Sequence, residues 1–149
     1  MNAVEDIMIE PAGEADLSAI LALLEQHGLP QAGLSDHLAT TLVARQGQAV
    51  VGSAALEIYD SAALLRSVAV DQARRGQGLG QRLTGAALDL ARQHGVTQLY
   101  LLTETAGNFF PRFGFQPITR TEVAPAVQRS VEFTTACPAS ALAMRASLS

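Results

Sequence analysis

The residues best suited to chemistry lie in one short segment, in which Arg74 and Arg75 precede Gly76, Gly78 and Gly80. A leucine- and valine-rich run comes before this segment, and a helix-like run follows it. Glycine removes the side chains that would block an approaching anion, so several backbone N–H groups and a helix start can face one spot. Arginine adds charge-assisted hydrogen bonds at the rim. The segment therefore predicts a phosphate-binding turn.

The glycine spacing and the lack of lysine exclude two common phosphate-binding motifs. A dinucleotide-binding G-x-G-x-x-G loop would need glycine at position 81 or 83, where the sequence has Gln81 and Leu83. All 10 basic residues are arginine, whereas a Walker A loop needs lysine, and so does a Schiff-base nucleophile. The pattern that remains is R-x-x-G-x-G, from Arg75 to Gly80.

The elements that must position this turn alternate between helical and extended patterns. Apolar residues repeat at helical spacing from Leu17 to Leu24 and from Leu79 to Leu90. We predict helices over 14–27, 78–94, 104–110 and 125–134, strands over 8–10, 40–45, 49–58, 63–70, 97–102, 115–118 and 141–146, and a loop or short helix over 31–39. The middle strands form an antiparallel meander, and helix 78–94 makes strands 63–70 and 97–102 parallel. The prediction is a single mixed α/β domain over 1–149, with a mostly antiparallel central sheet flanked by helices.

The composition and net charge of the chain argue against several further classes of function. The chain has 149 residues and a net charge of -4, which argues against nucleic-acid binding. It starts with no basic run and has no apolar stretch of about 20 residues, so we expect no signal peptide, no membrane span and a cytoplasmic location. The single cysteine, Cys137, excludes an internal disulfide, and we expect no metal site. The sequence leaves open whether the chain forms a homodimer.

With the R-x-x-G-x-G loop between a strand and an amphipathic helix, the chain resembles the GNAT superfamily of acetyl-coenzyme A-dependent N-acetyltransferases over nearly its whole length. The segment Phe109–Phe115 is similar to the family's (Y/F)-x-x-x-G-F motif. The resemblance implies that strand 63–70 splays from its parallel neighbour, with the cofactor's pantetheine arm in the gap. It also implies that loop amides hold the pyrophosphate of acetyl-CoA, namely those of Arg75, Gly76, Gln77, Gly78, Gly80 and Gln81. Backbone groups of Val68 and Val70 would pair with the pantetheine, and the Val68 N–H would polarise the thioester carbonyl.

Three further segments resemble one particular type within this superfamily: Leu64–Ser67, Tyr100–Thr103 and Val131–Ala141. They look like a small acetyltransferase type found in bacterial arsenic-resistance gene clusters. Related proteins acetylate the α-amino group of arsenic- or phosphorus-containing glutamate analogues. One cysteine cannot supply the several thiolates of an arsenite trap, so an arsenic link would run through acetylation of an organic amine.

Amine acetylation needs a general base, because an amine at neutral pH is mostly protonated. Glu57, at the end of strand 49–58, is the first candidate, and a solvent-exposed carboxylate is the equally weighted alternative. Glu104, after strand 97–102, is the second. Glu132 is the third, although we expect it to be exposed to solvent.

The leaving thiolate raises a second question. The resemblance implies a tyrosine proton donor four residues before Gly114, and this sequence has Phe110 there. Solvent, Thr103 or Thr105 would then supply the proton, or the chain would only bind the cofactor. An asparagine common seven residues earlier in the family is Thr103 here, which we also take as a candidate substrate-binding residue.

Several other side chains allow either a functional or a purely structural interpretation. Arg66 would hold a substrate carboxylate if it faces the cleft and is a solvated charge if it faces outward. We expect His27 and His94, each at a helix end, to interact with the helix dipole or with solvent rather than in catalysis. The phenylalanines near Phe110 favour core packing over adenine stacking, and Cys137 favours a small buried residue over a nucleophile.

The leading hypothesis is a cytoplasmic enzyme that transfers the acetyl group of acetyl-CoA to a small-molecule primary amine, by direct attack in a ternary complex. If the narrower resemblance holds, the amine belongs to an amino-acid-like compound with an anionic group. A coenzyme A-binding regulatory or scaffold module without turnover is the alternative. A third class, acetylation of protein lysines, would need a long acidic groove.

Overall fold

The computed structural model describes residues 7–104, 106–136 and 140–148. Seven strands form one sheet in the order β1-β2-β3-β4-β5-β7-β6. Their bounds are β1 Ile7–Pro11, β2 Thr41–Gln46, β3 Ala49–Tyr59, β4 Ala62–Val70, β5 Gln98–Thr103, β6 Gln116–Ile118 and β7 Leu142–Ser147. Among the described residues, β4 and β5 are the one parallel pair, and the other neighbours are antiparallel. The predicted mixed, mostly antiparallel sheet is confirmed.

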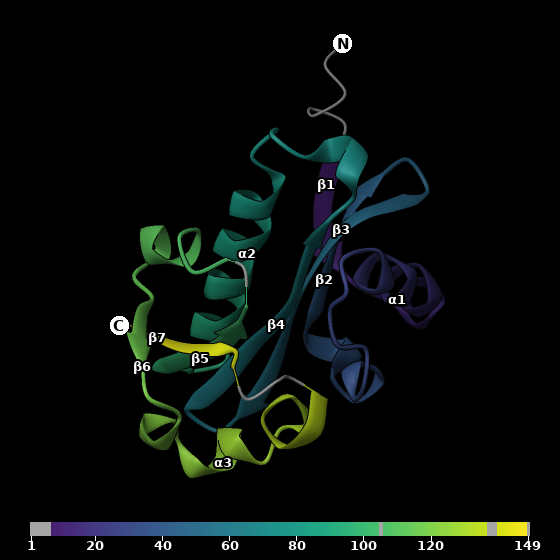
Figure 1. The fold of residues 1–149 in the computed structure, drawn as a ribbon. Helices are drawn as coiled ribbons and strands as arrows, with labels where there is room; N and C mark the ends of the chain where they lie inside the picture. Colours follow the sequence, from purple (N-terminus) through teal and green to yellow (C-terminus); the bar gives the residue numbers. More distant parts are fainter. Residues whose placement is uncertain (1–6, 105, 137–139, 149) are drawn as a thin grey trace.

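Two long helices cover opposite faces of this sheet (Figure 1). Helix α1 (Leu17–Gln26) buries Ile20, Leu23 and Leu24 against one face, and α2 (Leu79–Gln93) buries Leu83, Ala87 and neighbouring residues against the other. This is the helical spacing seen in the sequence. Helix α3 (Pro125–Gln128) and short turns complete the fold: η2 Glu14–Asp16, η3 Leu34–Thr40, η4 Gln72–Arg74, η5 Phe110–Phe113, η6 Arg120–Glu122 and the π turn η7 Glu132–Ala136.

The two parallel strands pair only at their starts. The register joins Ala62–Leu64 of β4 to Gln98–Tyr100 of β5, and no ladder continues from Leu65 to Val70. Because β5 continues to Thr103 in pairing with β7, the two strands separate after Leu64. The predicted splay is confirmed, and it leaves one edge of β4 without a neighbouring strand.

A bulge in β4 sets which backbone groups face that open edge. The β3–β4 register shifts between Ser53 and Ala55, and Ser67 adopts a positive φ of 59°. The Ser53 hydroxyl donates to the Ser67 carbonyl at 2.7 Å, which fixes the bulge. After it, the Asp71 amide donates to the Val51 carbonyl at 2.9 Å. Backbone groups alternate along a strand, so those of Val70 and Val68 face away from β3.

Two predicted helices are wrong in place or extent. Of the helix predicted over 104–110, residues 104 and 106–109 are not helical. The helical turn begins instead at Phe110, because Pro111 suits a first turn, and Gly114 ends it with a φ of 90°. The helix predicted over 125–134 is split into α3 and η7. At the break, the Ser130 hydroxyl oxygen accepts a hydrogen bond of 3.2 Å from the Glu132 amide.

Thr105 and Cys137 lie outside the described residues. In the part of the chain that the structure describes, no helix combines the length and the apolar character that crossing a membrane requires.

Candidate active site

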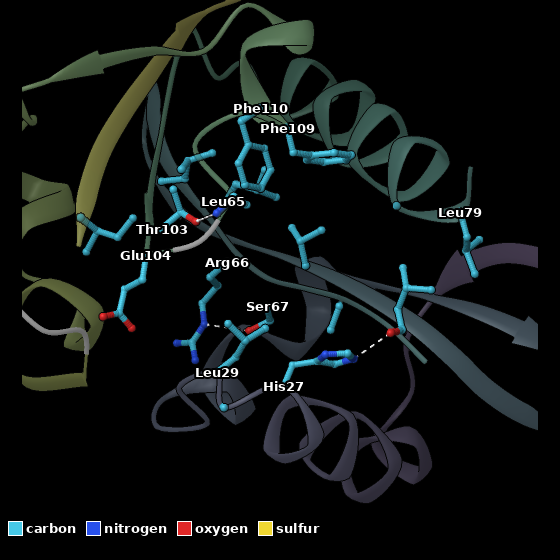
Figure 2. A pocket seen from close by; sticks show the side chains of 18 of the residues that line it. His27, Leu29, Leu65, Arg66, Ser67, Leu79, Thr103, Glu104, Phe109 and Phe110 are labelled. Carbon is cyan, nitrogen blue, oxygen red and sulfur yellow. Dashed lines mark hydrogen bonds between the residues drawn. The ribbon is translucent and has the colours of Figure 1, made fainter. Parts of the chain in front are cut away.

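A cleft of about 810 Å³ opens where β4 and β5 separate. Figure 2 shows that Phe109 and Phe110 lie on one side of it, and that His27 and Leu29, from the end of α1 and the following loop, lie on the other. The N-terminus of α2 and the preceding loop border the cleft, and residues from β5 and η7 complete it. The lining therefore includes segments from four separate parts of the sequence.

The glycine-rich loop presents bare amides to this cleft. Gly76 and Gly78 have φ values of 78° and 77°, a region that residues with a Cβ adopt at a cost. In the described part of the chain, no protein atom accepts a hydrogen bond from the amides of residues 76–81, and Gly78 caps α2 without a side-chain partner. Donors of this kind at the start of a 15-residue helix suit a diphosphate. The loop is thus built as the sequence predicts.

The edge of β4 supplies a second set of backbone groups. Val68 and Val70 line the cleft, and the alternation along β4 directs their N–H and C=O groups into it. An extended chain lying along this edge would meet β-type hydrogen-bond partners, as a pantetheine arm requires. His27 already donates from Nε2 to the Val70 carbonyl, at 2.7 Å.

Arg66 lies at the other end of the cleft in a buried charge cluster. Its Nη1 lies 2.8 Å from Glu57 Oε2, and its Nε lies 3.0 Å from Glu132 Oε2. The three side chains are 0%, 1% and 5% exposed, respectively. Arg66 also donates from Nη2 to the Pro30 carbonyl at 3.1 Å, and from Nε to the Ser67 hydroxyl at 3.2 Å. Of the two readings of Arg66, the structure supports a buried residue that faces the cleft.

Glu57 is held as a carboxylate. Burial alone would raise its pKa, but hydrogen bonds from Tyr59, Ser130 and Arg66 outweigh burial and lower the pKa below its ordinary value. The Tyr59 hydroxyl donates to Glu57 Oε1 at 2.6 Å, and burial together with this bond raises the pKa of Tyr59 to about 12. His37 Nε2 lies 3.7 Å from the same carboxylate. Glu57 is therefore neither exposed nor at the cleft wall.

Two further carboxylates do reach the cleft. Glu132, expected to be exposed, is buried and lines the cleft beside Arg66. Glu104 lines it from the end of β5 and is exposed. Thr103 also lines it, and its hydroxyl oxygen accepts the Ala106 amide at 3.0 Å, which leaves the hydroxyl proton available to donate. Phe110 occupies the position of the missing tyrosine and is 7% exposed.

Most of the predicted site residues meet around this one cleft. It is lined by Arg66, Val68, Val70, Arg75, Gly76, Gly78, Gly80, Gln81 and Thr103. Gln77 lies in the loop but is not among the lining residues, and neither is Glu57. His27 is the lining residue whose contacts sequence reasoning missed, because its place at a helix end says nothing of what lies across the cleft.

Comparison with known proteins identifies this arrangement. Residues 37–117 match the model of the acetyltransferase (GNAT) domain, a segment that includes the β4 edge, the glycine loop and α2. The chain belongs to the GNAT family. It is an acetyl-CoA-dependent N-acetyltransferase, and the resemblance to the GNAT superfamily is confirmed.

Two curated relatives show how far the sequence likeness extends. An uncharacterized N-acetyltransferase of Chlorobaculum tepidum is 29% identical over 123 residues, which cover 77% of this chain and 79% of the relative. An amino-acid acetyltransferase of Neisseria meningitidis is 27% identical over 126 residues, which cover 78% of this chain and 29% of the much longer relative.

Two solved structures share the fold. N-acetylglutamate synthase from Neisseria gonorrhoeae, complexed with coenzyme A and N-acetyl-glutamate, superposes with a TM-score of 0.82 at 22% identity, over 96% of this chain and 35% of that one. A Mycobacterium tuberculosis protein in complex with CoA and NLQ gives a TM-score of 0.80 at 25% identity, over 95% of this chain and 99% of that one.

The residues that line the cleft fit the cofactor. The unbonded amides of 76–81 suit its diphosphate, and the open edge of β4 suits the two amide groups of its pantetheine arm. Both features face the same cleft, which Arg66 and Glu132 border at its other end. When bound, acetyl-CoA would supply the activated acetyl group.

Proposed function

We propose that this GNAT enzyme acetylates the primary amine of a small, amino-acid-like molecule by direct transfer in a ternary complex. The observation that carries the proposal is the continuous cleft, which joins the amide-lined loop to a buried end with Arg66, Glu132 and Thr103. The relatives named above as an amino-acid acetyltransferase and an N-acetylglutamate synthase support an amino-acid acceptor. We place the reaction in the cytoplasm, where acetyl-CoA is available.

The transfer forms a bond between the amine nitrogen and the acetyl carbon and breaks the carbon–sulfur bond. The acceptor ammonium therefore loses two protons, one before its nitrogen attacks and one from that nitrogen after attack. The leaving thiolate gains one proton, so one proton is released overall. The Val68 N–H, fixed at the open edge of β4, would stabilise negative charge on the carbonyl oxygen. Thr103 is our candidate proton donor, because its hydroxyl proton is available inside the cleft.

Glu57, Glu104 or Glu132 would accept the first proton. Glu57 is ionised, but its lowered pKa makes it a weak base, and an intervening water or Tyr59 would have to connect it to the acceptor. Glu104 and Glu132 line the cleft, so they meet the requirement of direct reach. Replacing each by glutamine and comparing the pH dependence of kcat/KM separates the three, because removing the base abolishes the acidic limb of the profile.

Arg66 is our candidate anchor for an acceptor oxyanion. Its contacts with the described residues use three of its five N–H groups, and an oxyanion would bind the other two. Glu57 and Glu132 offset its charge, so Arg66 would orient an oxyanion by hydrogen bonds more than attract it from a distance. An arsenic- or phosphorus-containing glutamate analogue carries such a group, and the sequence resemblance at 64–67, 100–103 and 131–141 supports that class.

A coenzyme A-binding module without turnover is the second candidate, and Phe110 at the usual tyrosine position favours it. Thermal unfolding with and without acetyl-CoA, followed by thiol-release assays over a panel of amines, distinguishes the two. The panel contains glutamate, its phosphorus and arsenic analogues, diamines and a lysine peptide. We expect a higher Tm with acetyl-CoA and turnover of the glutamate-like amines. Binding without turnover of any amine would support the module.

A further inference from the structure

The end of helix α1 reaches across the cleft to both parts of the cofactor site. His27 Nε2 lies 2.7 Å from the Val70 carbonyl oxygen, on the open edge of β4. His27 Nδ1 lies 3.0 Å from Arg75 Nη2, at the entrance of the glycine loop. Figure 2 shows the His27 imidazole at the cleft, and a dashed line marks its hydrogen bond. One side chain thus joins the strand edge to the loop.

The two contacts fix the state of the ring. A carbonyl oxygen only accepts, so Nε2 must carry the hydrogen. A guanidinium only donates, so Nδ1 must be unprotonated. Both contacts are satisfied by the tautomer with its hydrogen on Nε2. Because one of the two partners is a full charge, the Arg75 contact is stronger than an ordinary neutral hydrogen bond.

Neighbouring contacts hold the same loop entrance. Gln26 Oε1 accepts the Gln72 amide at 3.3 Å, directly beside His27. On the far side, Arg74 Nε donates to Gln46 Oε1 at 2.8 Å. Beyond this entrance the amides of 76–81 have no protein partner among the described residues, and the loop is largely exposed. Glycines alone do not hold such a loop in one shape, so its order depends on its anchored start.

We infer that His27 is a positioning residue for acetyl-CoA. It holds the Val70 carbonyl and the Arg75 side chain in place before the cofactor binds, so less conformational freedom is lost on binding. The inference uses the family's cofactor and does not depend on which amine is the acceptor.

Titration calorimetry with coenzyme A on the full chain tests it directly. We expect His27→Leu to raise the Kd about tenfold, since it loses one neutral and one charge-assisted hydrogen bond. His27→Gln can donate from its amide nitrogen and accept at its oxygen, so it should recover most of the affinity. His94→Leu is the matched control, because His94 also caps a helix before a glycine but is exposed and outside the cleft lining. Its Kd should not change.

A double-mutant cycle separates positioning from general stability. If His27 acts through Arg75, His27→Leu should weaken binding much less in an Arg75→Leu background than in the wild type. Equal Kd values for wild type and His27→Leu would overturn the inference, and so would a loss that His27→Gln does not restore. If His27→Leu does not fold, His27→Gln and Arg75→Leu still test the inference. A wild-type Kd for Arg75→Leu would contradict a positioning role of His27.

Discussion

The guanidinium of Arg66 lies 2.8 Å from the carboxylate of Glu57, and neither side chain meets solvent. The pair joins β4 to β3, and Glu132 of η7 closes it from the C-terminal part of the chain. Buried charges are tolerated only when they are paired and hydrogen-bonded. The cluster therefore couples the folding of three segments to the shape of the end of the cleft where we propose that the acceptor binds.

Replacing Arg66 by methionine should destabilise the fold strongly. The change leaves two buried carboxylates without their shared cation, which costs about 3–5 kcal/mol of unfolding free energy. Arg45→Met is the matched control. Arg45 also pairs with two carboxylates, Glu10 and Asp16, but at a partly exposed site, so its loss should cost about 1 kcal/mol or less. Urea denaturation measures both, and equal losses would contradict the special weight of the buried cluster.

The lowered pKa of Glu57 predicts a specific loss of stability in acid. A group whose pKa is lower in the folded state stabilises fully above its ordinary pKa of 4.5 and loses that contribution as the pH falls through the lowered value. We expect the Tm of the wild type to fall more steeply than that of Glu57→Gln between about pH 5 and pH 3. Parallel curves for the two proteins would show that Glu57 does not carry this pH dependence.

The loop could be predicted from the sequence because its signals are local. Three glycines between a strand and an amphipathic helix predict the turn, and all these residues lie within about ten positions of one another. The parallel pairing follows from the helix that connects the two strands. Gly76 and Gly78 then adopt the positive φ values that the pattern requires.

The acceptor end could not be predicted in the same way, because its partners meet only in the folded chain. The contact of Arg66 with Glu132 joins positions 66 residues apart in the sequence, counted as 132 minus 66. This contact also depends on the bulge at Ser67, which no residue pattern predicts. The sequence predicts that a glutamate in a polar segment is exposed. Glu132 is buried instead, because the helix breaks at Ser130. His27 was misjudged for the same reason: its partners lie 43 and 48 residues away.

The conformation of Gly78 predicts a selective effect on cofactor binding. Gly78→Ala forces a Cβ onto a residue with a φ of 77°, at a cost of about 1–2 kcal/mol that the loop can relieve by moving its amides. We expect coenzyme A to bind about tenfold more weakly. Gly85→Ala, inside α2 with open space around its Cβ, should instead raise stability by about 1 kcal/mol and leave binding unchanged. Calorimetric titration and thermal melts provide the two readings.

Thr103 is expected to protonate the leaving thiolate. Thr103→Val removes the hydroxyl and should lower kcat about tenfold, less than usual for acid catalysis because a thiolate leaves readily. Thr103→Ser keeps the hydroxyl and should stay near the wild type. Adding Phe110→Tyr to the valine variant should restore part of the rate, since residue 110 lines the same cleft. Thiol release with a turned-over amine gives these rates, and an unchanged kcat for Thr103→Val would assign the proton to solvent.

Gly33 lets the loop after α1 pack closely against Val131, the residue before η7. A Cβ at Gly33 would lie 2.8 Å from Val131 Cγ1 and 3.6 Å from Arg66 Nη1, whereas a Cβ at Gly28 would meet nothing within 4 Å. Both glycines have positive φ, 79° and 65°, so alanine strains the backbone similarly at each. Only Gly33→Ala should also push Val131 and the adjacent Glu132 from the acceptor end. We expect Gly33→Ala to raise the acceptor KM about fivefold beyond Gly28→Ala, at equal affinity for coenzyme A. Matching KM values would mean that the contact with Val131 does not shape the acceptor site.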